Sequence, residues 1–330
     1  MQTIPKPMTG TRKRIAAFCF LVSALFLRNA QAAAEERPNT SRPSCGRTCS
    51  IAFVILTTSA QQDCRARAIE HTWGSHFRIY FITSTSTANR PGTRFVHFPG
   101  NDTYRNLKSK MKWFWLTYYE ELKVFDWIFK GDDDTFVRGW WLCQYLAGLN
   151  SSGSLYLGSN YGGKNRLALN SGGAGYVLSK SSLLLLYTCL VENKELFEEI
   201  RGSEEDVMTL RCLESGSNVE QLNMQDGEKI RFSPFSFNKR NLPDWTHLVM
   251  PEPGSDRRCR LSDSFFTFHR ASVRDICLFH ERYTRKDQRR FCQSDRLNAY
   301  QHPSILSHSL YHLSTASANC TFLSDLDCPG

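Results

Sequence analysis

The chain has 330 residues, of which 41% are apolar, 12% aromatic and 22% charged. These values exclude an intrinsically disordered chain, and the sequence also excludes collagen-like and coiled-coil architectures. A formal net charge of +9, from 41 Lys and Arg against 32 Asp and Glu, raises the hypothesis of a polyanion-binding protein. The basic excess is confined to two segments: residues 1–44 carry 7 basic and 2 acidic residues, and residues 231–300 carry 14 and 8. Residues 45–230, with 20 of each, are neutral.

The most apolar stretch of the chain, Ile15–Leu27, lies between basic residues near the N-terminus. Its thirteen residues are fewer than the roughly 20 that a membrane-spanning helix usually needs. They have the length of the hydrophobic region of a secretory signal, and Ala30-Gln31-Ala32 offers a cleavage site. We therefore expect residues 1–34 to be a targeting segment, either a cleaved signal peptide or a signal anchor. Residues 35–47 are polar and contain proline, which predicts a stem or linker.

The cysteines favour the same secretory route. Outside the apolar stretch there are eleven, at positions 45, 49, 64, 143, 189, 212, 259, 277, 292, 320 and 328. So many cysteines predict an oxidising compartment and several disulfides. Zinc binding is the alternative, but Cys45 and Cys49 have no second pair at zinc-finger spacing. Acceptor sites for N-glycosylation, which agree with secretion, occur at Asn39, Asn101, Asn150 and Asn319.

From residue 48 onward, apolar runs alternate with helical patterns. The expected strands are residues 51–57, 77–82, 94–98, 125–129, 155–157 and 167–178. The expected helices are residues 63–73, 103–124, 139–149 and 179–192. This alternation predicts an α/β fold in which helices flank a mostly parallel central sheet. We expect one domain over residues 48–300, followed by a C-terminal tail over residues 301–330.

Three consecutive carboxylates, Asp132-Asp133-Asp134, follow the expected strand 125–129. Ligand sites of α/β proteins gather at the carboxyl ends of strands, and clustered carboxylates repel one another unless a cation lies between them. Two carboxylates spaced as Asp-x-Asp suit Mg²⁺ or Mn²⁺, which take oxygen ligands and leave positions for phosphate. The alternative is a solvated acidic turn.

Three further motifs have both a functional and a structural interpretation. Gly172, Gly173 and Gly175 lie between apolar runs, where they allow the backbone to approach a ligand or simply form a tight turn or bulge. Asp206 precedes a helical pattern, so it is either a general base or part of a capping box begun by Ser203. His269 closes the run Phe265–Phe268 and is either a metal ligand or a structural histidine.

Taken in order, the segments FDWIFKGDDDTFV, NSGGAGYVLS, EEDVMTLRC and SFFTFH resemble glycosyltransferase family 31. The resemblance covers residues 48–275 and is closer to the core 1 β1,3-galactosyltransferases than to the Fringe-type transferases. It implies a GT-A-type nucleotide-sugar-binding fold, a catalytic domain over residues 48–300, and inverting transfer from a UDP-sugar with Mn²⁺. It also implies a single-pass type II protein of the Golgi membrane with a lumenal catalytic domain, the alternative being secretion after signal cleavage.

The resemblance also assigns roles to individual residues. Asp132, Asp134 and His269 would hold Mn²⁺, and Asp206 would accept the proton of the acceptor hydroxyl. The residues that would bind UDP-galactose or shape the donor and acceptor pocket are Asp132, Asp133, Gly172, Gly173, Gly175 and Trp245. Two features depart from the family: Leu210 replaces the glycine of Glu-Asp-x-x-x-Gly-Arg-Cys, and Trp245 is what remains of an aromatic-rich stretch before the histidine.

The predicted function is transfer of galactose from UDP-galactose, in β1,3 linkage, to O-linked GalNAc on glycoproteins. The alternatives are another family 31 activity such as a Fringe-like β1,3-N-acetylglucosaminyltransferase, a non-catalytic chaperone-like or lectin-like relative, and polyanion binding through residues 231–300. The expected partners are the UDP-sugar, the glycoprotein acceptor and, through an uncleaved N-terminus, the membrane. Nucleic acid is not expected, and a homodimer is left open. The basic residues that would face a UDP diphosphate or an acidic glycoprotein are Arg257, Arg258, Arg260 and Arg270.

Overall fold

The computed structural model describes residues 49–85, 93–161, 167–200, 202–216, 218–226, 229–237 and 260–288. The expected targeting segment (1–34), stem (35–47) and tail (301–330) lie outside these ranges, as does Trp245. Within the described ranges, no helix combines the length and apolar character that crossing a bilayer requires.

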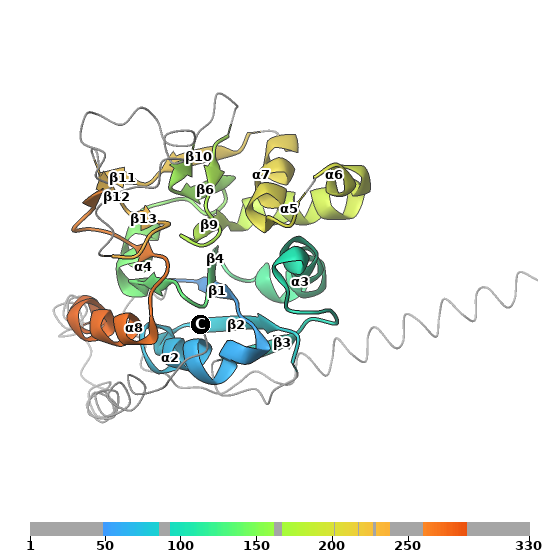
Figure 1. Cartoon of the computed structure of the whole chain (residues 1–330). Coiled ribbons are helices and arrows are strands. Elements are labelled where there is room, and N and C mark those ends of the chain that lie inside the picture. The colour runs from blue at the N-terminus through green and yellow to red at the C-terminus, as the bar shows by residue number, and fades with distance from the viewer. Residues whose placement is uncertain are drawn as a thin grey trace, which may run out of the picture. The chain divides into compact units, whose positions relative to one another are not determined.

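A seven-stranded sheet forms the centre of the domain (Figure 1). Its strands follow the order β10-β6-β9-β4-β1-β2-β3. Their bounds are β1 Ile51–Leu56, β2 Arg78–Thr83, β3 Thr93–His97, β4 Trp127–Asp132, β6 Leu155–Gly158, β9 Tyr176–Ser179 and β10 Glu220–Asn223. Strands β4, β1, β2 and β3 are parallel, β10 is parallel to β6, and β9 runs antiparallel to both of its neighbours. The predicted α/β fold with a mostly parallel sheet is confirmed.

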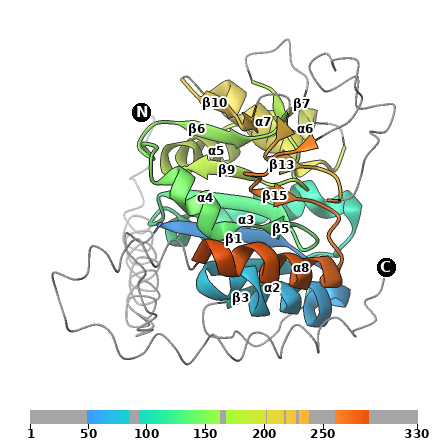
Figure 2. The same ribbon diagram turned by 90° about the vertical axis from the view of Figure 1, so that its left-hand side faces the viewer.

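Helices cover both faces of this sheet, as the two views in Figures 1 and 2 show. One face carries α3 (Leu107–Leu122), α5 (Lys180–Glu192), α6 (Lys194–Glu199) and α7 (Glu205–Ser215). The other carries α2 (Arg67–His71), α4 (Gly139–Leu146) and α8 (Val273–Phe279). All six residues of β1 are buried because alternate side chains point to opposite faces: Phe53 packs with the second group of helices, and Val54 with the first.

Short elements complete the fold. The short strands are β5 Phe136–Val137, β7 Asn160–Tyr161, β8 Leu169–Asn170, β11 Gln225–Asp226, β12 Lys229–Ile230, β13 Phe232–Ser233, β14 Arg260–Leu261 and β15 Thr267–Phe268. The 3₁₀ turns are η1 Ser59–Gln61, η3 Trp73–His76 and η4 Tyr104–Asn106, and the π-helical turns are η2 Gln62–Ala66 and η6 His280–Thr284. Because β15 pairs antiparallel with β5, which follows the acidic triad, the residue after β15 lies close to the triad.

Three sequence predictions differ from the structure. Strand β4 extends to Asp132 instead of ending at residue 129, because the buried Lys130 is neutralised inside the strand. The expected strand 167–178 is two short strands, β8 and β9, separated by a glycine-containing turn. The expected helix 63–73 is a π-helical turn followed by the short helix α2.

A disulfide between Cys189 and Cys212 joins α5 to α7. Cys64 is also disulfide-bonded. The cysteine content therefore predicted disulfide bonding correctly.

Candidate active site

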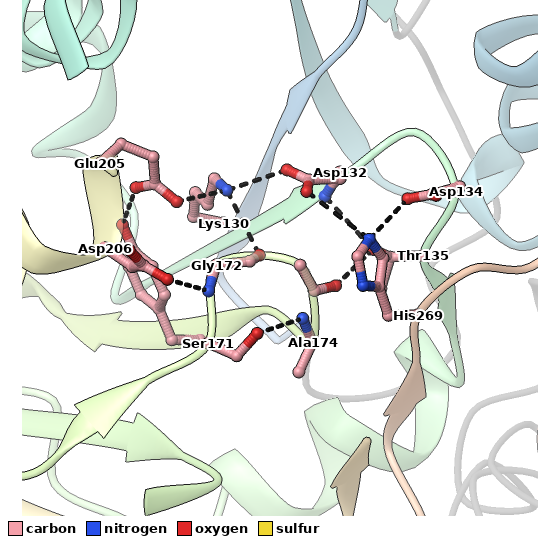
Figure 3. A network of polar contacts seen from close by, with 12 residues as sticks. Lys130, Asp132, Asp134, Thr135, Ser171, Gly172, Ala174, Glu205, Asp206 and His269 are labelled. Carbon is pink, nitrogen blue, oxygen red and sulfur yellow. Dashed lines mark hydrogen bonds and ion pairs between the residues drawn. The ribbon is translucent and has the colours of Figure 1, made fainter. Parts of the chain in front are cut away.

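The carboxyl end of β4 and the residue after β15 bring together Asp132, Asp134 and His269, from positions far apart in the chain (Figure 3). One ligand atom of each lies within 4.8 Å of the others. His269 Nε2 is 3.0 Å from Asp134 Oδ1 and 3.8 Å from Asp132 Oδ2. Each of the three side chains is partly exposed, so a ligand from solvent can reach the group. Two carboxylates and one imidazole form a ligand set that suits a divalent cation such as Mn²⁺.

The imidazole of His269 is oriented by the backbone around it. His269 N–H donates to the carbonyl of Ser233 at 2.9 Å, and Nδ1 lies 3.3 Å from the carbonyl oxygen of Pro234. A carbonyl only accepts, so Nδ1 must carry the proton, and Nε2 is the atom that faces the carboxylates. Burial works against the charged imidazole, but the hydrogen bond that the ring donates to the carboxylate of Asp134 outweighs it and raises the pKa of His269. In metal-binding histidines, the ring nitrogen that does not bind the metal typically donates a hydrogen bond, as Nδ1 of His269 does to the carbonyl of Pro234.

Asp133 is not part of the group that Asp132, Asp134 and His269 form. Its side chain is buried, with Oδ2 accepting from Thr57 Oγ1 at 2.6 Å and Oδ1 from Arg65 Nη1 at 3.4 Å. Burial raises the pKa of Asp133 to about 7. The same Arg65 lies 3.9 Å from Asp134 Oδ2. The structure therefore separates Asp133 from the candidate ligands, and gives it contacts that fix the loop after β4 to the end of β1.

The glycines of the turn between β8 and β9 allow two polar clusters to approach the same backbone. A Cβ atom on Gly173 would overlap the ring of His269, and one on Gly172 would overlap the carboxylate of Glu205. Gly175 has φ = +83°, which L-residues rarely adopt, and a Cβ there would also strike Phe129. The carbonyl of Gly173 accepts from Thr135 Oγ1 at 2.7 Å, which ties the turn to the acidic triad.

Asp206 lies at the opposite end of this turn. Its Oδ2 accepts from Gly172 N–H at 2.9 Å, and its Oδ1 accepts from Val207 N–H at 2.9 Å. Burial raises the pKa of Asp206 above its ordinary value. The capping-box interpretation is wrong, because α7 begins at Glu205 with Glu204 as its N-cap residue and no side-chain cap. Asp206 instead contacts the glycine turn, so its carboxylate belongs to the candidate site.

Two residues of the site were not identified from the sequence. Lys130, in β4, is fully buried, and its Nζ lies 2.5 Å from Glu205 Oε1 and 2.9 Å from Asp132 Oδ1. In Figure 3 its ammonium group lies between these two carboxylates. The available signal was a single lysine inside an otherwise apolar strand, two residues before Asp132. Its main partner, Glu205, lies 75 positions later, so the pairing left no local pattern.

A family sequence model described as Fringe-like matches residues 47–224, which is more than half of the chain. The chain belongs to the Fringe-like family. The predicted membership of glycosyltransferase family 31 is thereby confirmed, and so is the prediction that this Fringe-like protein is a glycosyltransferase. The match includes the acidic triad, the glycine turn and Asp206, and it ends before His269.

Curated relatives of this Fringe-like chain include two kinds of enzyme. Human chondroitin sulfate synthase 3 is 27% identical over 176 residues, which cover 48% of this chain and 20% of that protein. Glycoprotein-N-acetylgalactosamine 3-beta-galactosyltransferase 1 of Xenopus laevis is 25% identical over 246 residues, covering 67% of this chain and 62% of that one. The chain thus spans a fifth of the synthase and less than two thirds of the galactosyltransferase.

Solved structures similar to the Fringe-like chain are also glycosyltransferases, at low similarity. Galactosyltransferase LgtC in complex with donor and acceptor sugar analogs is 12% identical with a TM-score of 0.37, over 72% of this chain and 95% of that one. Mannosyltransferase PcManGT from Pyrobaculum calidifontis, in complex with GDP-Man and Mn²⁺, is 11% identical with a TM-score of 0.30, over 63% and 65%. Similarities at this level do not extend the family assignment.

Proposed function

We propose that the protein is a Mn²⁺-dependent inverting β1,3-galactosyltransferase that transfers galactose from UDP-galactose to O-linked GalNAc on glycoproteins. The observation that carries the proposal is the convergence of two groups on one glycine turn. Asp132, Asp134 and His269 lie at one end of it, and Asp206 lies at the other. A glycosyl transfer needs these two groups, one for the leaving diphosphate and one for the attacking hydroxyl.

Asp132, Asp134 and His269 would hold the divalent cation. When bound there, the cation supplies charge neutralisation for the diphosphate that leaves with uridine. His269 donates its Nδ1 proton to the carbonyl of Pro234, which leaves Nε2 directed at the ligand position. Arg65 adds a positive charge beside Asp134.

Asp206 would accept the proton of the acceptor hydroxyl. As that proton moves to the carboxylate, the acceptor oxygen forms a bond to the anomeric carbon of galactose, and the bond from that carbon to the phosphate oxygen breaks. UDP leaves with the bonding electrons, and one displacement inverts the anomeric centre. The backbone N–H groups of Gly172 and Val207 hold the carboxylate in place. Burial raises the pKa of Asp206, and a higher pKa makes the carboxylate a stronger proton acceptor.

The choice of galactose and O-linked GalNAc rests on sequence similarity. The Xenopus laevis relative, named for 3-beta-galactosyl transfer to glycoprotein N-acetylgalactosamine, aligns over two thirds of this chain. The sequence segments named above resemble the same group of enzymes. Trp245 and Arg270 are our candidates for contacts with the acceptor sugar and the diphosphate, respectively, and Gly172, Gly173 and Gly175 shape the pocket between donor and acceptor.

The proposed cellular location rests on the N-terminal segment and on a disulfide. We propose a lumenal catalytic domain over residues 48–300, carried into the Golgi by the N-terminal segment. The Cys189–Cys212 disulfide supports an oxidising compartment. N-terminal sequencing of secreted protein separates a cleaved signal peptide, which removes residues 1–32, from an uncleaved anchor, which leaves the protein in membranes.

The test is a matrix of donors and acceptors. Full-length protein made in a secretory host is incubated with UDP-galactose or UDP-GlcNAc and with GalNAc-peptide or fucosyl-peptide, in Mn²⁺ or EDTA. We expect galactose transfer to GalNAc-peptide in Mn²⁺ and none in EDTA. Transfer of GlcNAc alone would identify a Fringe-like specificity and reject the proposal. No transfer from either donor by folded protein would favour a chaperone-like or lectin-like relative. Salt-sensitive polyanion binding that survives loss of Asp134 would favour the basic segment as the functional region.

A further inference from the structure

Lys130 is a charged side chain inside the central sheet. It is among the largest fully buried side chains, and its position in β4 places it next to β1 and β9. Its ammonium group has three hydrogen-bond acceptors: Glu205 Oε1 at 2.5 Å, Asp132 Oδ1 at 2.9 Å and the carbonyl of Gly172 at 3.2 Å. An ammonium group has three N–H bonds, so all of its donors are satisfied.

The ammonium group of Lys130 is paired with carboxylates despite its burial. Glu205 Oε1 and Asp132 Oδ1, 2.5 Å and 2.9 Å from Nζ, offset the cost of burying the charge. A neutral side chain there would leave the buried carboxylate of Glu205 without its cationic partner. Lys130, in β4, therefore links this strand to Glu205, the first residue of α7, through a buried ion pair.

The contacts of Lys130 connect the two halves of the proposed site. On one side they reach Asp132, a candidate metal ligand. On the other they reach Glu205, the neighbour of Asp206, and the carbonyl of Gly172, whose own N–H donates to Asp206. The backbone of Gly172 thus binds Lys130 through its carbonyl and Asp206 through its N–H. Figure 3 shows this chain of contacts running from Asp132 through Lys130 and Gly172 to Asp206.

We propose that Lys130 is a positioning residue that holds the metal-binding carboxylate of Asp132 and the base Asp206 at a fixed separation. The inference rests on the proposed function for the roles of Asp132 and Asp206. Lys130 itself would not contact the reacting atoms, since its side chain is fully buried and its ammonium group is occupied by three protein acceptors. Its loss should therefore affect Mn²⁺ affinity and turnover together, because both depend on the same fixed geometry.

The first experiment compares Lys130→Met with Lys110→Met in the full-length protein. Lys110 is a matched control because it is also buried, with Nζ 2.5 Å from Asp102 Oδ1 and 2.7 Å from the carbonyl of Thr57. Both variants lose a buried cation and should lose stability. Isothermal titration with Mn²⁺ should show affinity about 10–100-fold weaker for Lys130→Met, as for other residues that orient metal ligands. Lys110→Met removes contacts to Thr57 and Asp102 but none to Asp132 or Gly172, so it should weaken Mn²⁺ binding less than Lys130→Met does.

A second readout is the pH profile of kcat/KM. The positive charge of Lys130 lowers the pKa of Asp206, so its removal should move the acid limb to higher pH. The groups that act on Asp206 through their charge or that face it are Lys130, Asp132, Glu205, Tyr104 and Tyr156. A lysine with a purely structural role would lower the amount of folded enzyme without moving this limb.

The double variant Lys130→Met with Glu205→Gln covers the case in which the single variant does not fold, because it removes both charges of the buried pair. We expect it to fold and still to show weaker Mn²⁺ binding and a lower kcat. Wild-type Mn²⁺ affinity and kcat in the folded double variant would overturn the inference, and so would a double variant that fails to fold. If the wild type itself binds no Mn²⁺, the proposed function fails, which is a different outcome from matching wild-type and variant affinities.

Discussion

Replacing Gly173 with alanine adds one methyl group at the point where the glycine turn meets the metal-binding histidine. The added Cβ would lie 2.6 Å from Nδ1 and 2.7 Å from Nε2 of His269, closer than real Cβ contacts allow. The turn cannot simply retreat, because the carbonyl of Gly173 accepts a hydrogen bond of 2.7 Å from Thr135 Oγ1. The imidazole must therefore move, although it is held 3.0 Å from Asp134 Oδ1.

The size of the effect follows from these contacts. Overpacking by one methyl group costs about 1–3 kcal/mol of stability. Displacing a metal ligand from its supporting contacts lowers metal affinity about 10–100-fold. The variant should therefore unfold at lower temperature than the wild type and should bind Mn²⁺ more weakly by at least about tenfold.

Thermal unfolding and calorimetric titration with Mn²⁺ measure the two effects. Gly148→Ala is the matched control, because a Cβ at this position meets its nearest neighbour, the carbonyl of Tyr145, at 3.5 Å. That variant should retain wild-type stability and Mn²⁺ affinity. A folded Gly173→Ala variant with unchanged Mn²⁺ affinity would refute the placement of His269 as a ligand held against this turn.

Three other predictions follow from single observations. Because burial raises the pKa of Asp206 and the base must be ionised, kcat/KM should fall with decreasing pH through a pKa above that of an exposed aspartate; a limb that coincides with loss of Mn²⁺ binding would contradict this. Arg270 has φ = +58°, so Arg270→Gly should stabilise the fold by about 1 kcal/mol in thermal unfolding while weakening UDP binding; lower stability would argue against relief of strain. Replacing both Cys189 and Cys212 with serine opens a loop with a sequence separation of 23 and should cost about 3 kcal/mol in denaturant unfolding, whereas an unchanged midpoint would contradict the bond.

Much of the fold could be predicted because its signals are local. The run Ile51–Leu56 is apolar throughout, as expected for a parallel strand buried on both faces, and it forms β1. The expected helix 103–124 contains α3, whose buried residues include Phe114. The rule that ligand sites lie at the carboxyl ends of strands drew attention to Asp132 and Asp134, and the structure brings both to His269.

The features that could not be predicted depend on contacts between distant segments. Lys130 suggests the end of a strand when only its neighbours are considered, yet β4 continues past it because Glu205 neutralises its charge. Asp133 cannot be distinguished from Asp132 and Asp134 by sequence, but in the turn after β4 its side chain accepts a hydrogen bond from Thr57. Asp206 had a plausible local partner in a capping box, and its actual partner, Gly172, comes from another part of the chain.

The central claim is that Asp206 is the base of a Mn²⁺-dependent galactosyl transfer. The most direct measurement compares wild type with Asp206→Asn for transfer of labelled galactose from UDP-galactose to GalNAc-peptide, with Mn²⁺-UDP affinity determined on the same preparations. We predict equal Mn²⁺-UDP affinity and a rate lower in the variant by about 10²–10⁴, the usual contribution of a positioned general base. Transfer by Asp206→Asn at the wild-type rate, or loss of Mn²⁺-UDP binding in the folded variant, would contradict the account.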